Sequence, residues 1–149
     1  MLRAKRVDHV SMAVWDLEQQ VAFFEKTFGW KVHARFKNER EGYSGAAMDI
    51  APGQPQFEIL EPLGEHSFLH RFLRERGPGV HHVTIEVEDA DAAAEHLRGC
   101  GVEPFGGPRV SWDWKEFFVH PRDTNGVLFQ LYEQVPPPSS APHDHHEAG

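Results

Sequence analysis

Two segments of this chain occur twice at nearly the same separation. The segment VDHVSMAVWD reappears as VHHVTIEVED, which pairs His9 with His82 at an offset of 82 − 9 = 73. The segment FEILE reappears as FQLYE, which pairs Glu58 with Gln130 at an offset of 130 − 58 = 72. Two segments that keep almost one offset indicate a duplicated unit rather than chance similarity. The sequence therefore predicts two copies of one supersecondary unit.

The hydrophobic pattern within each copy predicts the order β-α-β-β-β. In the first copy, Val10, Met12 and Val14 alternate with polar or small residues, as in a strand with one apolar face. Asp16 is a suitable N-cap for the helix that follows, which we expect to end near Gly29. Three further strands are expected at residues 31–36, 45–50 and 56–60. The second copy has the same order, with a strand through Val83, Ile85 and Val87, a helix from Asp89 or Asp91 to Gly99, and strands near residues 102–105, 116–120 and 127–132.

We expect an α+β fold in which two tandem β-α-β-β-β modules form a cupped mixed sheet around a metal site. The predicted parts are a first module at residues 5–62, a connecting helix at 63–79, a second module at 80–134 and a disordered tail at 135–149. Helical spacing of apolar residues from Phe68 to Leu73, followed by Gly77-Pro78-Gly79, predicts the connecting helix. The tail is rich in Pro and Ser, a composition that buries too little apolar surface to fold.

Four polar residues at equivalent positions of the repeat are candidate metal ligands, namely His9, Glu58, His82 and Gln130. Alternation places each of them on the strand face opposite to the apolar residues. A single His on such a face is more often exposed or hydrogen-bonded than metal-bound, but the repeat pairs two His with one Glu and one Gln. Imidazole and carboxylate bind Co, Zn, Ni, Mn and Fe(II), so this donor set does not select one metal. His81 faces the other way, and we expect it to have a structural or supporting role.

Charge and composition limit the partners. The formal net charge of −8 argues against a nucleic-acid partner. No apolar run reaches the roughly 20 residues of a membrane helix, and the amino terminus has no apolar signal stretch. We therefore expect a cytoplasmic protein without membrane contact. The single cysteine, Cys100, cannot form an internal disulfide, and we expect no catalytic role for it.

The residues resemble the vicinal oxygen chelate superfamily, which includes glyoxalases, bleomycin resistance proteins and dioxygenases, over about residues 5–134. Within it, the chain is most similar to the methylmalonyl-CoA epimerase family through the motifs VDHV, EILEPLG, GVHHV and FVHPR. The resemblance implies that His9, Glu58, His82 and Gln130 bind a divalent metal ion. It also implies a small anionic substrate such as an acyl-CoA, and a homodimer.

Two departures from that family are visible. The family usually has Glu where this chain has Gln130, so Glu58 is the one carboxylate of the ligand set. A glycine-rich stretch of the family is replaced here by a segment that contains Trp112 and Trp114. These tryptophans are expected to reshape the mouth of the substrate cavity.

The predicted function is that of a metal-dependent isomerase, similar to methylmalonyl-CoA epimerase. A divalent ion stabilises an enolate, so that a positioned carboxylate can remove the proton α to the thioester carbonyl. The resemblance loosely aligns Glu41 with the glutamate of the epimerases, although an exposed turn carboxylate is an equally good interpretation. Glu86 shares a strand face with His82 and is the second candidate for the base.

Three alternatives remain open from the sequence. The first is an enzyme similar to lactoylglutathione lyase, which the connecting helix argues against. The second is an Fe(II) extradiol dioxygenase that uses His9, His82 and Glu58, although Gln130 would crowd its open coordination position. The third is a metal-independent binding protein whose tryptophans stack on a small-molecule ligand.

Overall fold

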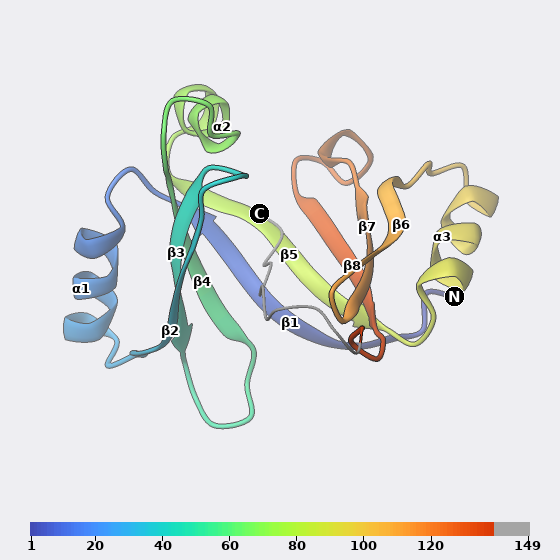
Figure 1. Cartoon of the computed structure of the whole chain (residues 1–149), viewed down its shortest axis with the longest axis horizontal. Coiled ribbons are helices and arrows are strands. Elements are labelled where there is room, and N and C mark those ends of the chain that lie inside the picture. Colours follow the sequence, from blue (N-terminus) through green and yellow to red (C-terminus); the bar gives the residue numbers. More distant parts are fainter. Residues whose placement is uncertain (139–149) are drawn as a thin grey trace. The chain divides into compact units, whose positions relative to one another are not determined.

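A computed structural model describes residues 1–138 of the chain and confirms the predicted fold class. Within this range, eight strands form one mixed sheet in the order β2-β3-β4-β1-β5-β8-β7-β6 (Figure 1). The elements are β1 (Ala4–Ala13), α1 (Leu17–Thr27), β2 (Lys31–Asn38), β3 (Tyr43–Asp49), β4 (Gln56–Pro62), α2 (Leu69–Arg76), β5 (Gly79–Val87), α3 (Ala90–Gly99), β6 (Phe105–Ser111), β7 (Trp114–Val119), the short 3₁₀ helix η1 (Pro121–Asp123) and β8 (Leu128–Gln134). The described residues divide into two compact units, residues 9–81 and residues 1–8 together with 82–138. Most of the predicted tail lies outside the described residues.

The unit of residues 9–81 is built from parallel pairing of β1 with β4 and antiparallel pairing of β4, β3 and β2. Helix α1 covers one face of these strands. Its first turn is capped by Asp16, whose carboxylate accepts a hydrogen bond from the backbone N–H of Gln19 at 3.1 Å. Its buried side is formed by Leu17, Val21 and Phe24, which pack against Met48 and Ile59 of the sheet.

The second unit repeats this construction. Strand β5 pairs in parallel with β8, which pairs antiparallel with β7, and β7 with β6. Asp89 caps α3 by accepting a hydrogen bond from the N–H of Ala92 at 3.0 Å. The alanine face of α3, at Ala90, Ala93 and Ala94, packs on Val87 and on apolar residues of β7 and β8. Small side chains allow close approach of the helix to the sheet.

The repeat extends to hydrogen bonds that the sequence did not predict. The N–H of Leu17 at the start of α1 donates to Glu61 of β4 at 2.7 Å. The N–H of Ala90 at the start of α3 donates to Glu133 of β8 at 2.9 Å. Each carboxylate therefore satisfies a backbone donor at a helix N-terminus and favours the helix electrostatically. These contacts fix each helix on the strand that carries a candidate ligand, Glu58 or Gln130.

The largest difference from the sequence-based expectation is strand β6. A strand was predicted near residues 102–105, but the strand is Phe105–Ser111. Gly106 and Gly107 have φ angles of 68° and 155°, and the register with β7 shifts between Phe105 and Arg109. The irregularity accommodates a Gly-Gly-Pro sequence that is typical of a turn.

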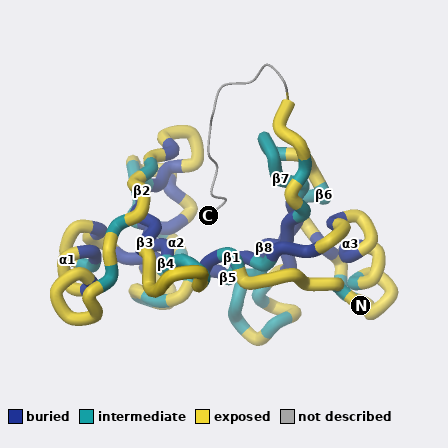
Figure 2. Tube along the Cα trace, turned by 90° about the horizontal axis from the view of Figure 1, so that it is seen from below, coloured by how far each residue is buried: buried dark blue, intermediate teal, exposed yellow. Residues whose placement is uncertain are grey.

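Helix α2 lies within the segment 63–79, where a connecting helix was expected, and it is shorter than that segment. Its buried residues Leu69 and Leu73 pack with Tyr43 and Leu60, and Gly77 ends it at a φ angle of 75°. Among the described residues, no helix is long and apolar enough to cross a membrane. The central residues of β4 and β8 are buried and most of the remaining residues of these strands are intermediate. In Figure 2, exposed residues prevail along α1 and α3.

Candidate metal centre

Polar side chains are buried on one face of four strands. They are His9 and Ser11 on β1, Glu58 on β4, His82, Thr84 and Glu86 on β5, and Gln130 on β8. Their alternating neighbours Met12, Ile59, Ile85 and Leu131 belong to the apolar clusters beneath the helices. The alternation of each strand therefore separates an apolar, helix-covered face from a polar, buried one. Buried polar groups at this density require partners or a bound ion.

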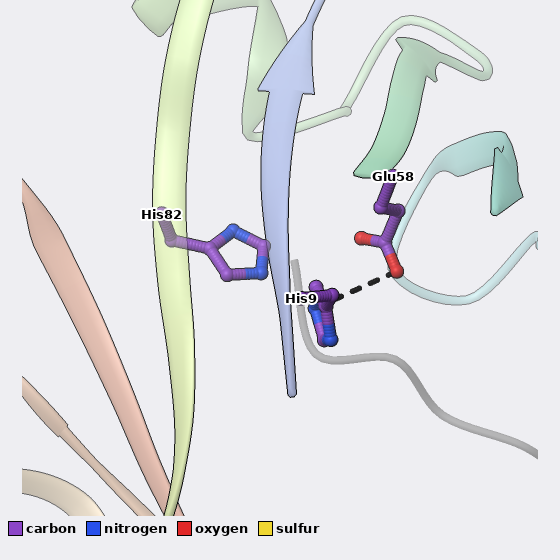
Figure 3. A group of neighbouring side chains, drawn as sticks. All are labelled: His9, Glu58 and His82. Atoms are coloured by element: carbon purple, nitrogen blue, oxygen red, sulfur yellow. Dashed lines mark ion pairs between the residues drawn. The ribbon is translucent and has the colours of Figure 1, made fainter. Parts of the chain in front are cut away.

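His9, Glu58 and His82 form a cluster. Each offers one ligand atom, and these atoms all lie within 4.8 Å of one another. Figure 3 shows the three side chains approaching from β1, β4 and β5. Nε2 of His9 lies 3.6 Å from Oε2 of Glu58, and all three side chains are almost fully buried. Two imidazoles and one carboxylate at this spacing fit a divalent transition-metal ion, because such an ion compensates the buried carboxylate charge.

Ser11 supports the carboxylate of this cluster. Its hydroxyl donates to Oε1 of Glu58 at 2.6 Å, and β1 and β4 are in a register that places Ser11 next to Glu58. The other oxygen, Oε2, is the one near His9. The hydroxyl thus orients the carboxylate with one oxygen directed toward the histidine.

Gln130 occupies the equivalent position on β8. Its Oε1 accepts a hydrogen bond from the hydroxyl of Thr84 at 2.8 Å, which corresponds to the contact between Ser11 and Glu58. Its Nε2 donates to Oε2 of Glu116 on β7. The role of Gln130 as a metal ligand stays a prediction.

Glu116 is a buried residue of this site that the sequence analysis did not select. It lies on the same face of β7 as Trp114 and Phe118, opposite to Phe117, which packs beneath α3. The alternation test that identified Gln130 could have identified Glu116, because Phe117 and Val119 mark the apolar face of that strand.

The two candidates for the base lie in different surroundings. Glu86 is 8% exposed, and its carboxylate pairs with Arg6 at 2.9 Å and with Lys5 at 3.4 Å. Glu41 is exposed in the turn between β2 and β3, where its backbone N–H donates to the side chain of Asn38. Two cationic side chains therefore hold the carboxylate of Glu86 on the polar face. For Glu41, the hydrogen bond to Asn38 holds the backbone rather than the carboxylate.

Tyr132 extends the polar face beyond Glu86. Its hydroxyl donates to Asp8 at 2.7 Å, and the guanidinium of Arg6 also contacts Asp8. Burial and the hydrogen bond to Asp8 raise the pKa of Tyr132 above its usual range, so the phenol remains protonated. The ring of Trp114 stacks on Tyr132 at a centroid distance of 3.6 Å. One face of this predicted ligand-stacking tryptophan is therefore occupied by a tyrosine of the protein.

His81 packs among the rings of Phe68 and Phe72, at centroid distances of 5.6 and 5.0 Å. Burial, with a smaller contribution from the charge of Arg76, lowers the pKa of His81 to about 4. This histidine is therefore neutral near pH 7, and its ring contributes to packing beside α2.

Comparison with known proteins agrees with this geometry. The model of the Glyoxalase/Bleomycin resistance protein/Dioxygenase superfamily matches residues 8–118. The chain belongs to this superfamily, as the resemblance predicted. An ethylmalonyl-CoA/methylmalonyl-CoA epimerase of Cereibacter sphaeroides is 37% identical over 135 residues, which are 87% of this chain and 98% of that protein.

Solved structures give the same result. The crystal structure of methylmalonyl-CoA epimerase from Mycobacterium tuberculosis has a TM-score of 0.78 and 30% identity, over 90% of this chain and 91% of that one. A methylmalonyl-CoA epimerase in complex with methylmalonyl-CoA and NH4+ has a TM-score of 0.74 and 34% identity, over 91% and 99% of the two chains. These relatives are enzymes of the isomerase class.

Proposed function

We propose that this protein is a metal-dependent epimerase that acts on the carbon α to a thioester, with methylmalonyl-CoA or a close acyl-CoA as its substrate. The observation that carries the proposal is the buried cluster of His9, Glu58 and His82. The chain that holds this cluster is 37% identical to a named epimerase and matches 98% of the length of that epimerase. Gln130 is proposed as the fourth ligand. The homodimer and the cytoplasmic location remain predictions.

The cluster suits an anionic substrate. A divalent ion held by His9, Glu58 and His82 would supply positive charge to the carbonyl oxygens of a substrate and so make its α-proton more acidic. Glu58 is the one carboxylate among the proposed ligands, so a divalent ion together with these four ligands would carry a net charge of about +1. Carboxylate and thioester oxygens of a malonyl-type substrate are therefore attracted to it.

A carboxylate must then remove the α-proton. We favour Glu86 over Glu41, because Glu86 lies on the strand face that carries His82 and Thr84. Its ion pairs with Arg6 and Lys5 hold the carboxylate in one position. A base that is already held in place loses less conformational entropy when it reaches the geometry for proton transfer. Inversion of the substrate requires that a proton be returned to the opposite face of the planar intermediate.

The alternatives receive less support. The named epimerase of Cereibacter sphaeroides is 37% identical and is covered over 98% of its length. The matching lactoylglutathione lyases are 25–26% identical and are covered over 46% of theirs. Stacking of Trp114 on Tyr132 occupies one face of the indole that a metal-independent binding protein would use. A two-histidine, one-carboxylate set would also fit an Fe(II) dioxygenase, so oxygen uptake in the presence of iron is the measurement that separates that alternative.

The test is exchange of the α-proton. A single epimer of methylmalonyl-CoA is incubated in D₂O with the metal-loaded protein, and both deuterium at the α-carbon and the ratio of epimers are followed. We expect exchange and epimerisation well above the rate in buffer, lost in His82→Ala and retained in His33→Ala, since His33 is an exposed histidine of β2. No exchange above buffer with any divalent metal would contradict the proposal.

A further inference from the structure

Glu116 is a buried carboxylate to which the proposed reaction gives no role. It is 2% exposed on β7, and the neighbouring Phe117 packs on the other face of the strand beneath α3. A carboxylate at this depth is costly unless polar groups compensate it. Nε2 of Gln130 on the adjacent strand β8 donates a hydrogen bond to its Oε2 at 2.5 Å.

This contact determines which way the amide of Gln130 points. An amide nitrogen only donates, so it faces the carboxylate of Glu116 on β7. The amide oxygen is then directed to the other side, where it accepts from Thr84 of β5 at 2.8 Å. Figure 1 shows β8 lying between β7 and β5. Because Thr84 is two residues from His82 on the same strand face, the oxygen is directed toward the strand that carries this histidine.

Glu58, the equivalent residue of the other module, does not require a neighbour to determine the orientation of its terminal group. Both terminal atoms of Glu58 are oxygens, so one accepts from Ser11 while the other lies near His9. Gln130 has one oxygen, and a reversed amide would present a nitrogen, which is a poor ligand for a metal ion. A hydrogen bond from the amide to a carboxylate also increases the electron density on the amide oxygen.

We propose that Glu116 is a positioning residue of the metal centre. Glu116 holds the amide of Gln130 so that the amide oxygen is directed toward β5. It also places a negative charge next to the amide nitrogen. Glu116 and Gln130 together thus take the place of a negatively charged fourth ligand. The proposal rests on the proposed metal-dependent function, because it requires Gln130 to bind the ion.

The test is Co(II) binding to the full-length chain in which the tail histidines His143, His145 and His146 are changed to Ala, here called the tail-substituted chain. In Glu116→Gln we expect the Kd for Co(II) to rise by about 10–100-fold, with a changed d–d absorption spectrum. In Gln130→Ala the same substitution of Glu116 should add no further loss, because Glu116 acts through Gln130. Glu103→Gln, a change at an exposed carboxylate paired with Arg98, is the matched control and should leave the Kd unchanged.

Two results distinguish failure of the proposed metal-dependent function from failure of the positioning role alone. If the tail-substituted chain binds no Co(II), the proposed function and this inference both fail. If it binds Co(II) and Glu116→Gln leaves both the Kd and the spectrum unchanged, the positioning role alone is wrong. Should Glu116→Gln not fold, the double variant Glu116→Gln/Gln130→Glu decides, since it keeps one carboxylate and one amide in contact. We expect this variant to bind Co(II) at least as tightly as its parent, and a folded double variant with weakened binding would overturn the proposal.

Discussion

Ser11 and Thr84 provide a matched comparison between a charged and a neutral hydrogen-bond acceptor. Both hydroxyls are fully buried at equivalent positions of the repeat, and they donate to Glu58 at 2.6 Å and to Gln130 at 2.8 Å. A hydrogen bond to a charged group contributes about 1.5–3 kcal/mol to stability, and one between neutral groups about 0.5–1.5 kcal/mol. Ser11→Ala should therefore lower the free energy of unfolding by roughly 1 kcal/mol more than Thr84→Val does.

The assay is urea unfolding of the metal-free protein, followed by circular dichroism. Thr27→Ala serves as a control, because Thr27 is exposed near the end of α1 and should change the free energy of unfolding by less than about 0.5 kcal/mol. A Thr84→Val variant that is destabilised as much as Ser11→Ala would refute the reasoning. It would mean that the charge difference between Glu58 and Gln130 does not determine the strength of these contacts.

Two further predictions concern stability. Because native His81 stays neutral to about pH 4 while an unfolded imidazole protonates below about pH 6.5, stability should fall as the pH is lowered across this window, by at most about 3 kcal/mol. This loss should be absent from a pH series of urea titrations on His81→Gln, and an equal loss in that variant would assign it to other groups. Asp16→Ala and Asp89→Ala should each cost about 1 kcal/mol in thermal unfolding, because each removes a helix N-cap hydrogen bond. Markedly unequal costs would show that the two caps are not energetically equivalent.

The repeat explains why most of the fold was predictable from sequence. Alternation and capping each occur twice, so Asp16 and Asp89 independently indicate the same construction. Strand β6 was misplaced because Gly106 and Gly107 are typical of turns, and only pairing with β7 stabilises a strand there. The local hydrophobic pattern of a segment does not indicate with which distant strand the segment pairs.

The site was partly predictable for the same reason. The repeat identified His9, Glu58 and His82, which the structure brings together. It could not identify Glu116, because that residue has no acidic counterpart in the first copy. Glu116 lies opposite Tyr132 of β8, and the equivalent residue of β3, opposite Leu60 of β4, is Gly45. A functional residue that occurs in one copy alone cannot be found by comparing the two copies.

The central claim is that His9, Glu58 and His82 hold a divalent metal ion. The most direct measurement is the metal content of the tail-substituted chain after purification and dialysis, compared with its His9→Ala, His82→Ala and His33→Ala variants. The account predicts about one divalent ion per chain in the parent and in His33→Ala, and loss of that ion in both His9→Ala and His82→Ala. No bound metal in the parent after reconstitution, or full metal content in either site variant, would contradict it.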